Sequence, residues 1–301
     1  MHLADLYPEE HIYSGLVRSR YLSGQMFVSE RRFFELNELP YHWLRSQTPL
    51  CSNLKFVIDA LKLEPEKRYQ LRIHHSPLAP WLLSYTDGQD PMNVELSGLR
   101  NNLEENPFNI DRRWKFCPKC LIENRAKYGV SYWHSQHQLL GARTCYIHHT
   151  ALHSHDDLRY LNFTLPHHWI AKSEPLLAED KWQKEWQSFI FKISAAIVSN
   201  PDIVNQLKKD IHQHLSIYKP VKRSHKALLN SLFFKMREEL GEECLAGLFT
   251  AYARKIPRPP NILWVTLSPF TQNTGLRHPL YWLSILFWLK DNLPTMKELM
   301  K

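Results

Sequence analysis

Two short pairs of metal-ligating residues lie in the middle of the chain. Cys117 and Cys120 are separated by two residues, and so are Cys145 and His148. Two intervening residues allow a tight turn to direct both side chains of a pair at one ion, and two such turns supply a tetrahedral set of four ligands. We therefore predict a zinc ion bound by three thiolates and one imidazole.

The residues around these pairs bear on what such a site would do. His149 is an alternative fourth ligand, whereas His134 and His137 are weaker candidates because a Trp-flanked helix face more often carries core histidines. Four protein ligands leave no position for an activated water, so we expect a structural rather than a catalytic site. Glu123 is the one acid between the pairs, and we interpret it as a solvated helix-face residue.

The rest of the chain must position these pairs, and its composition indicates helices. Its 301 residues include 19 Pro but only 9 Gly, and 44% of them are hydrophobic. This composition predicts two or three compact units built from helices and proline-containing loops. A helix over residues 131–139 is expected to cross the segment between the two pairs and to bury Tyr132, Trp133 and Gln136.

The last 130 or so residues show their own helical patterns. Apolar residues recur every three or four positions from Trp182 to Ile197, which predicts a long amphipathic helix. Further on, Ser224 is expected to cap a helix that ends at Gly241, and residues 242–253 are expected to form a second helix. This pair is the better candidate in the chain for helix-turn-helix geometry.

Charge is distributed unevenly along the chain. Residues 1–110 carry 11 Lys and Arg against 14 Asp and Glu, residues 111–170 carry 8 against 4, and residues 171–301 carry 19 against 12. A cationic second half suggests that nucleic acid meets the zinc-binding and C-terminal parts, while the first half faces protein.

Clusters of cations flank the predicted helix pair. Phosphate contacts are typically made by Lys and Arg at loops and helix ends. The residues that we predict to contact DNA are Lys219, Lys222, Arg223, Lys226, Arg254, Lys255 and Arg258.

Several motifs resemble the TniQ/TnsD family of transposon target-selection proteins. They are F-C-P-x-C-L over residues 116–121, Y-G-x-x-Y-W-H over residues 128–134 and H-Q-L-L-G-x-x-x-C-x-x-H over residues 137–148. The opening Y-P-E-E-H-I-Y-S over residues 7–14 and the ending R-H-P-L before an apolar segment are also similar to family members. The sequence departs from the family pattern at Leu140, where Pro is common, and in its doubled His148-His149.

The resemblance implies a protein that performs no strand chemistry itself, and the chain has no glycine-rich phosphate loop. Such proteins mark an insertion site on double-stranded DNA and recruit the AAA+ ATPase TnsC, which brings in the transposase. We expect direct reading of DNA, as in TnsD-type members. The alternative is a TniQ adaptor that docks on the guide-RNA complex of a CRISPR-associated transposon. A zinc-dependent nuclease acting through His148, His149 and Glu123 is a distant alternative.

Together these patterns predict a mainly α-helical protein in three parts. A helical N-terminal TniQ-like domain is expected over residues 1–110, a zinc-knuckle module over residues 111–170, and a basic helical C-terminal domain over residues 171–301. The sequence shows no secretory signal and no apolar run of the roughly 20 residues that a membrane span requires. Metal-spaced cysteines are typical of a reducing cytoplasm, so we expect a cytoplasmic protein with no membrane contact.

Overall fold

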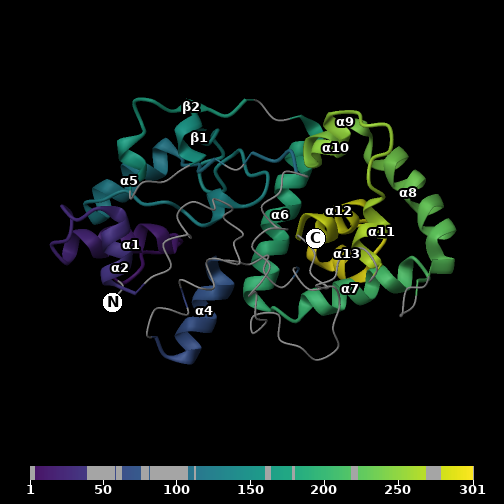
Figure 1. Cartoon of the computed structure of the whole chain (residues 1–301), viewed down its shortest axis with the longest axis horizontal. Coiled ribbons are helices and arrows are strands. Elements are labelled where there is room, and N and C mark those ends of the chain that lie inside the picture. The colour runs from purple at the N-terminus through teal and green to yellow at the C-terminus, as the bar shows by residue number, and fades with distance from the viewer. Residues whose placement is uncertain are drawn as a thin grey trace. The chain divides into compact units, whose positions relative to one another are not determined.

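The computed structural model describes residues 4–38, 58, 63–75, 81, 108–111, 113–159, 164–177, 180–217, 223–268 and 279–300. These residues are mainly helical, as predicted. The chain forms two compact units (Figure 1). Unit 1 comprises Met1–Ser76 and Asp111–Gln187, and unit 2 comprises Pro77–Ile110 and Ser188–Lys301. The division into three domains remains a prediction.

Unit 1 combines short helices with turns and one small sheet. Its helices are α1 (Ile12–Leu22), α2 (Glu30–Leu36), α4 (Pro65–His75) and α5 (Pro118–Tyr128), and its 3-10 turns are η4 (Gln136–Gln138), η5 (Asp156–Arg159) and η6 (Pro166–His168). Strands β1 (His153–Ser154) and β2 (Glu174–Pro175) pair in antiparallel fashion, with His153 opposite Pro175. Side-chain caps define where the first two helices begin, because His11 accepts from the Tyr13 N–H and Ser29 from the Arg32 N–H.

The segment before and into α1 is joined to residues 131–135 by a set of hydrogen bonds that we call the N-terminal seam. Four of them are His11 N–H to Trp133 O at 2.7 Å, Trp133 N–H to Ser14 Oγ at 2.8 Å, Ser135 N–H to Glu9 O at 2.9 Å, and Tyr132 O–H to Pro8 O at 2.9 Å. The seam thus connects parts of the chain that are about 120 residues apart, and it uses both backbone groups of Trp133.

The predicted helix over residues 131–139 is wrong. Residues 131–133 are irregular, His134 forms an isolated bridge with Glu10, and only Gln136–Gln138 forms a 3-10 turn. The physical reason is the seam, because a backbone that hydrogen-bonds the N-terminal segment is not available for bonds four residues along its own chain. The expected burial is confirmed for Tyr132 and Trp133, whereas Gln136 is only half-buried.

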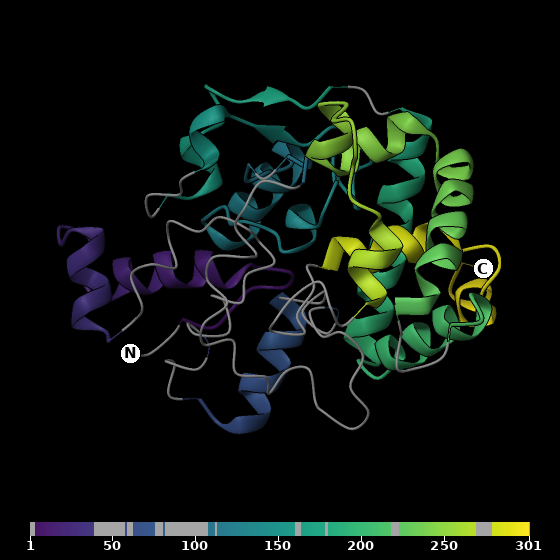
Figure 2. The same ribbon diagram turned by 45° about the vertical axis from the view of Figure 1, so that its right-hand side comes forward.

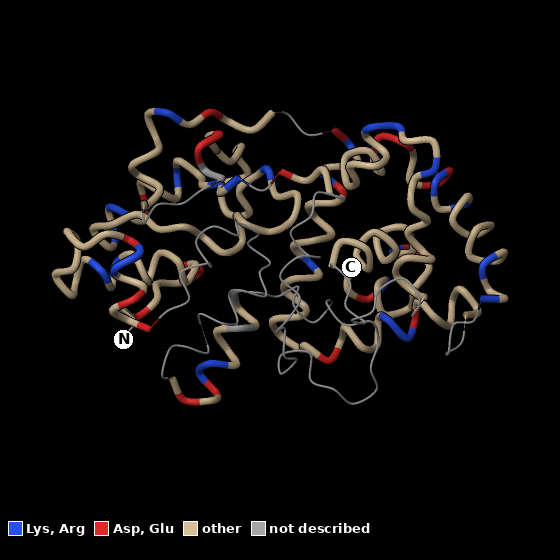
Figure 3. Tube along the Cα trace, in the orientation of Figure 1, with Lys and Arg blue, Asp and Glu red and all other residues tan. Residues whose placement is uncertain are grey.

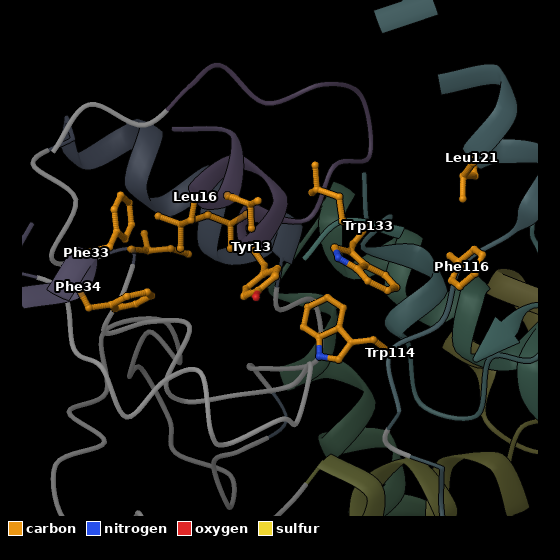
Figure 4. Close-up of a cluster of buried hydrophobic side chains, with 12 residues drawn as sticks. Tyr13, Leu16, Phe33, Phe34, Trp114, Phe116, Leu121 and Trp133 are labelled. Carbon is orange, nitrogen blue, oxygen red and sulfur yellow. The ribbon is translucent and has the colours of Figure 1, made fainter. Parts of the chain in front are cut away.

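Trp133 lies in the core of unit 1 (Figure 4). Its ring packs edge-to-face on Trp114 and Phe116, with ring centroids 5.5 and 5.9 Å away. The ring of Tyr13 in α1 lies 5.4 Å from that of Trp114, so the core joins the N-terminal helix to the segment that leads into the Cys117 turn. The Trp133 indole N–H donates to Thr164 O at 2.9 Å, which satisfies its one polar group.

Position 141 accepts only glycine, because the ring of Trp186 lies close to its backbone. Gly141 has φ +78°, and a Cβ built there would lie 2.8 Å from the ring of Trp186. The Trp186 indole N–H also donates to Leu140 O at 3.0 Å. Within unit 1, this contact fastens the first part of α6 (Lys181–Ser199) to the loop before Cys145, and any side chain at Gly141 would displace it.

Unit 2 is a set of helices around one apolar helix, α12 (Pro279–Trp288), whose residues are nearly all buried. It contacts α7 (Ile203–His214), α8 (Lys226–Leu240) and α11 (Ile262–Leu267), as Figures 1 and 2 illustrate. The other elements are the later part of α6, turn η7 (Arg223–His225), α9 (Glu242–Leu248), α10 (Thr250–Ala253) and α13 (Pro294–Met300). Among the described residues, no helix combines the length and apolar character needed to cross a bilayer.

The helical patterns predicted in this half are confirmed in part. α6 covers the predicted amphipathic stretch, and α8 ends at Gly241, which has φ +79°. Ser224 does not cap α8, because the 3-10 turn η7 precedes the helix and His225 occupies the cap position. The single helix expected over residues 242–253 is also wrong, since extended backbone at Phe249 divides it into α9 and α10.

A buried ion pair stabilises the start of unit 1. The side chain of Glu10 is fully buried and receives two hydrogen bonds from Arg18, at 2.9 and 2.6 Å. The Tyr7 N–H donates a third bond at 2.8 Å, and the Arg18 guanidinium lies 4.1 Å from the centre of the Tyr7 ring. Burial raises the pKa of Glu10 although Arg18 opposes this, so the carboxylate depends on its partner.

Replacing Arg18 by Met should therefore destabilise the protein strongly. The substitution keeps the apolar stem but leaves a buried carboxylate without its cation, which costs about 3–5 kcal/mol. The matched control is Arg31→Met, because Arg31 pairs with Glu35 on an exposed helix face, where solvent screening leaves such pairs little effect on stability. Urea unfolding followed by tryptophan fluorescence measures both, and equal midpoints for the two variants would contradict this account.

Candidate metal centre

The first ligand pair is positioned by the start of α5. Cys117 occupies the cap position of this helix, Pro118 its first residue, and Cys120 its first turn. Proline suits a first helical position because its φ is already helical and no N–H is lost there. Both thiols are buried, and both lie at a helix N-terminus, which favours negative charge.

The second pair lies in a tight turn between Thr144 and Ala151, which form an isolated antiparallel bridge. Within it, the Cys145 N–H donates to Thr150 O at 2.8 Å and the His149 N–H donates to Cys145 O at 2.9 Å. His149 has φ +52°, the left-handed conformation that reverses the chain directly after His148. The two neighbouring histidines therefore point differently, and His149 is exposed.

The two turns bring their four side chains together. One ligand atom from each of Cys117, Cys120, Cys145 and His148 lies within 4.8 Å of every other. The His148 Nδ1 is 3.5, 3.2 and 3.7 Å from the Sγ atoms of Cys117, Cys120 and Cys145, and the Sγ atoms of Cys120 and Cys145 are 3.6 Å apart. A zinc tetrahedron with bonds of about 2.3 Å to sulfur and 2.0 Å to nitrogen has edges of about 3.5–3.8 Å.

The chemistry of this donor set fits a metal ion. Three thiols and one imidazole are buried or half-buried and face one point, at spacings that match the edges of a coordination tetrahedron. This buried Cys3His cluster could therefore bind a metal ion, as the residue spacing in the sequence predicts. His149, the alternative fourth ligand, does not belong to the group.

Neighbouring groups hold the cluster in place. The His148 Nε2 lies 2.9 Å from Glu123 Oε1, which leaves Nδ1 to face the sulfurs. The His148 N–H donates to Cys145 Sγ at 3.4 Å, and the Thr150 hydroxyl lies 3.6 Å from Cys117 Sγ. Glu123 is largely exposed, as expected, but its contact with His148 is a role that the sequence did not reveal.

These contacts also shift the acidities of the cluster. Hydrogen bonds from Cys120 and Cys145 lower the pKa of Cys117, and the same bond to Cys117 raises the pKa of Cys120. Burial lowers the pKa of His148, but the hydrogen bonds with Glu123 and Cys117 outweigh it, so that this pKa is raised overall. One thiol of the group is therefore the first to ionise, and a metal would complete the deprotonation of the others.

Two further histidines, His134 and His137, lie beside the cluster, and together with Cys120 they form a second buried group of possible ligands. The His137 Nε2 is 3.4 Å from Cys145 Sγ, and the His134 Nε2 is 2.8 Å from the amide nitrogen of Asn124. Burial lowers the pKa of His134 to about 4 and that of His137 well below its ordinary value, so both rings are neutral near pH 7.

The cations predicted to contact DNA lie in unit 2. Arg223 and Lys226 are exposed at the start of α8, and Arg254, Lys255 and Arg258 are exposed after α10. Figure 3 shows how Lys and Arg are distributed along these segments. The remaining two, Lys219 and Lys222, lie outside the described residues.

Comparison with known proteins identifies the first half of the chain. Residues 3–152 match the sequence model of the TniQ family, whereas none of the curated proteins matches the chain. The matched range contains the N-terminal seam and all four residues of the Cys3His cluster. TniQ family proteins are non-catalytic transposition factors, and membership implies a role in selecting transposition targets. The chain belongs to the TniQ family through a domain that covers residues 3–152.

Proposed function

We propose that this protein selects the target site of a transposon with a TnsABC-type machinery, by binding double-stranded target DNA and recruiting the AAA+ regulator TnsC. The observation that carries the proposal is the TniQ domain of residues 3–152, in which the seam and the Cys3His cluster belong to one compact unit. The protein itself performs no strand chemistry in this account, and the transposase is brought in by the regulator.

We infer that the metal of the cluster is zinc, held by Cys117, Cys120, Cys145 and His148. Thiolates and imidazole are typical zinc ligands, and four protein ligands fill a tetrahedron without leaving a place for a reactive water. The Glu123–His148 contact supports this role, since a carboxylate commonly orients a metal-bound histidine. The same arrangement argues against a zinc-dependent nuclease, because Glu123 faces the far side of the imidazole ring.

DNA binding is assigned to the basic half of the chain. Arg223, Lys226, Arg254, Lys255 and Arg258 are exposed near the ends of helices, where cations typically contact phosphates. α8 and α9 are joined through Gly241 alone, and α9 begins with two glutamates, so the helix pair differs from an ordinary helix-turn-helix. We therefore place the phosphate contacts on the segments before α8 and after α10 rather than on α9.

Removal of one thiolate should abolish metal binding. We expect the purified wild-type chain to contain one zinc ion, the Cys117→Ser variant to contain almost none, and the His149→Ala variant to retain it. Elemental analysis by mass spectrometry measures the content directly. Retention of zinc by His148→Ala together with its loss from His149→Ala would show that His149 is the fourth ligand.

Direct reading of DNA can be tested by selecting sequences from a random duplex library at about 0.15 M salt, where non-specific phosphate binding is weak. We expect one sequence to be enriched. For that sequence, replacing Arg254 and Arg258 by Ala should make the negative slope of log affinity against log salt shallower by about two. Each lost phosphate contact reduces the magnitude of the slope by roughly one. Arg31→Ala, an exposed cation of unit 1, is the control and should leave the slope unchanged.

Salt-sensitive binding without any enriched sequence would contradict direct reading. It would favour the alternative role, in which the chain is an adaptor that docks on the guide-RNA complex of a CRISPR-associated transposon. In that case the Arg254 and Arg258 variants would weaken binding to every duplex by the same factor.

A further inference from the structure

His137 lies against the metal cluster without belonging to its four residues. Its side chain is completely buried, and its Nε2 is 3.4 Å from the Sγ atom of Cys145. Within the described part of the structure, the other ring nitrogen, Nδ1, has no hydrogen-bond partner. Among the described residues, the one hydrogen-bonding contact of this imidazole is therefore made with a thiol of the cluster.

The protonation of this ring follows from its surroundings. A neutral imidazole carries one N–H, and a thiolate sulfur can only accept a hydrogen bond. With nothing bonded to Nδ1, the proton that makes a favourable contact is the one on Nε2, which points at the sulfur. His137 is then a donor to Cys145.

The surrounding residues keep this ring in place. His137 belongs to turn η4, and its ring packs on those of His134 and Tyr146, with centroids 4.7 and 5.8 Å away. The next side chain, Gln138, donates to Lys115 O at 2.7 Å and to His134 O at 3.1 Å, which joins the turn to the segment before Cys117. Little rotation is left to the imidazole once the turn is formed.

A hydrogen-bond donor at this position would stabilise the negative charge of a zinc-loaded cluster. Zinc with three thiolates and one neutral imidazole carries a net charge of −1, and burial of such a charge is unfavourable unless donors surround it. Cys145 already receives the His148 N–H, and Cys117 lies near the Thr150 hydroxyl. The His148 Nδ1 also faces Cys145, but it is a proposed metal ligand, so the His137 imidazole adds a side-chain nitrogen that can donate to this sulfur.

We propose that His137 is a positioning residue that donates its Nε2–H to the Cys145 thiolate and thereby slows release of the metal. The inference rests on the zinc site proposed above. It also excludes the Nε2 atom of His137 as a ligand of a second ion in the group with Cys120 and His134, because a nitrogen that carries a proton cannot bind a metal.

The test compares His137→Gln with His137→Met in the zinc-loaded, full-length chain. The two replacements are similar in size, but only Gln retains an N–H that can reach the sulfur. Zinc content per chain and the rate of zinc transfer to a colorimetric chelator are measured. We expect one zinc ion in each protein, release from the Met variant about 10–100 times faster than from wild type, and release from the Gln variant closer to wild type. His149→Met, an exposed neighbour, should release zinc at the wild-type rate.

Each outcome bears on a different claim. A wild-type chain that binds no zinc would refute the zinc site itself. One zinc ion per chain with equal release rates from the Gln and Met variants would overturn only the role of His137. Two zinc ions in the wild-type chain but only one in the His137→Gln chain would overturn it as well, because His137 would then be a ligand. If the Met variant fails to fold, cobalt-loaded wild type is compared with His137→Leu, which also lacks an N–H, and identical thiolate-to-cobalt absorption bands in the two proteins would contradict the inference.

Discussion

The structure of unit 1 depends on one constraint, that two turns 25 residues apart must present their ligand atoms to a single point. Cys117 and Cys120 meet it because α5 starts between them, and Cys145 and His148 meet it because His149 reverses the chain immediately afterwards. The chain between the turns has to leave the cluster and return. It does so as α5, the irregular segment at Trp133 and turn η4.

The N-terminal segment hydrogen-bonds to this connecting stretch of the chain at residues 132–135. Trp133 offers its backbone to His11 and Ser14 and its ring to the core, while the buried Glu10–Arg18 pair keeps the segment before α1 in register. The family range of residues 3–152 thus includes the N-terminal seam as well as the metal cluster, and both of these lie in unit 1.

The sequence predicted those features that depend on residues close together along the chain. The two-residue spacings identified the four clustered residues, and apolar periodicity identified α6, because both depend on residues within one or two turns of each other. The helix predicted over residues 131–139 was wrong because long-range contacts determine this segment. The partners of its backbone groups lie about 120 residues earlier in the chain. The contact of Glu123 with His148 and the approach of His137 to Cys145 were missed for the same reason, as neither follows from spacing along the chain.

The central claim is that metal binding and the N-terminal seam form one cooperative structure, and hydrogen exchange tests it most directly. Amide exchange of the full chain is compared with zinc bound and after chelation. The account predicts that chelation accelerates exchange in α5 and the turn after Cys145 and, to a similar extent, at His11, Trp133 and Ser135 of the seam, whereas α12 of unit 2 keeps its protection. Unchanged protection of the seam after loss of zinc would contradict it.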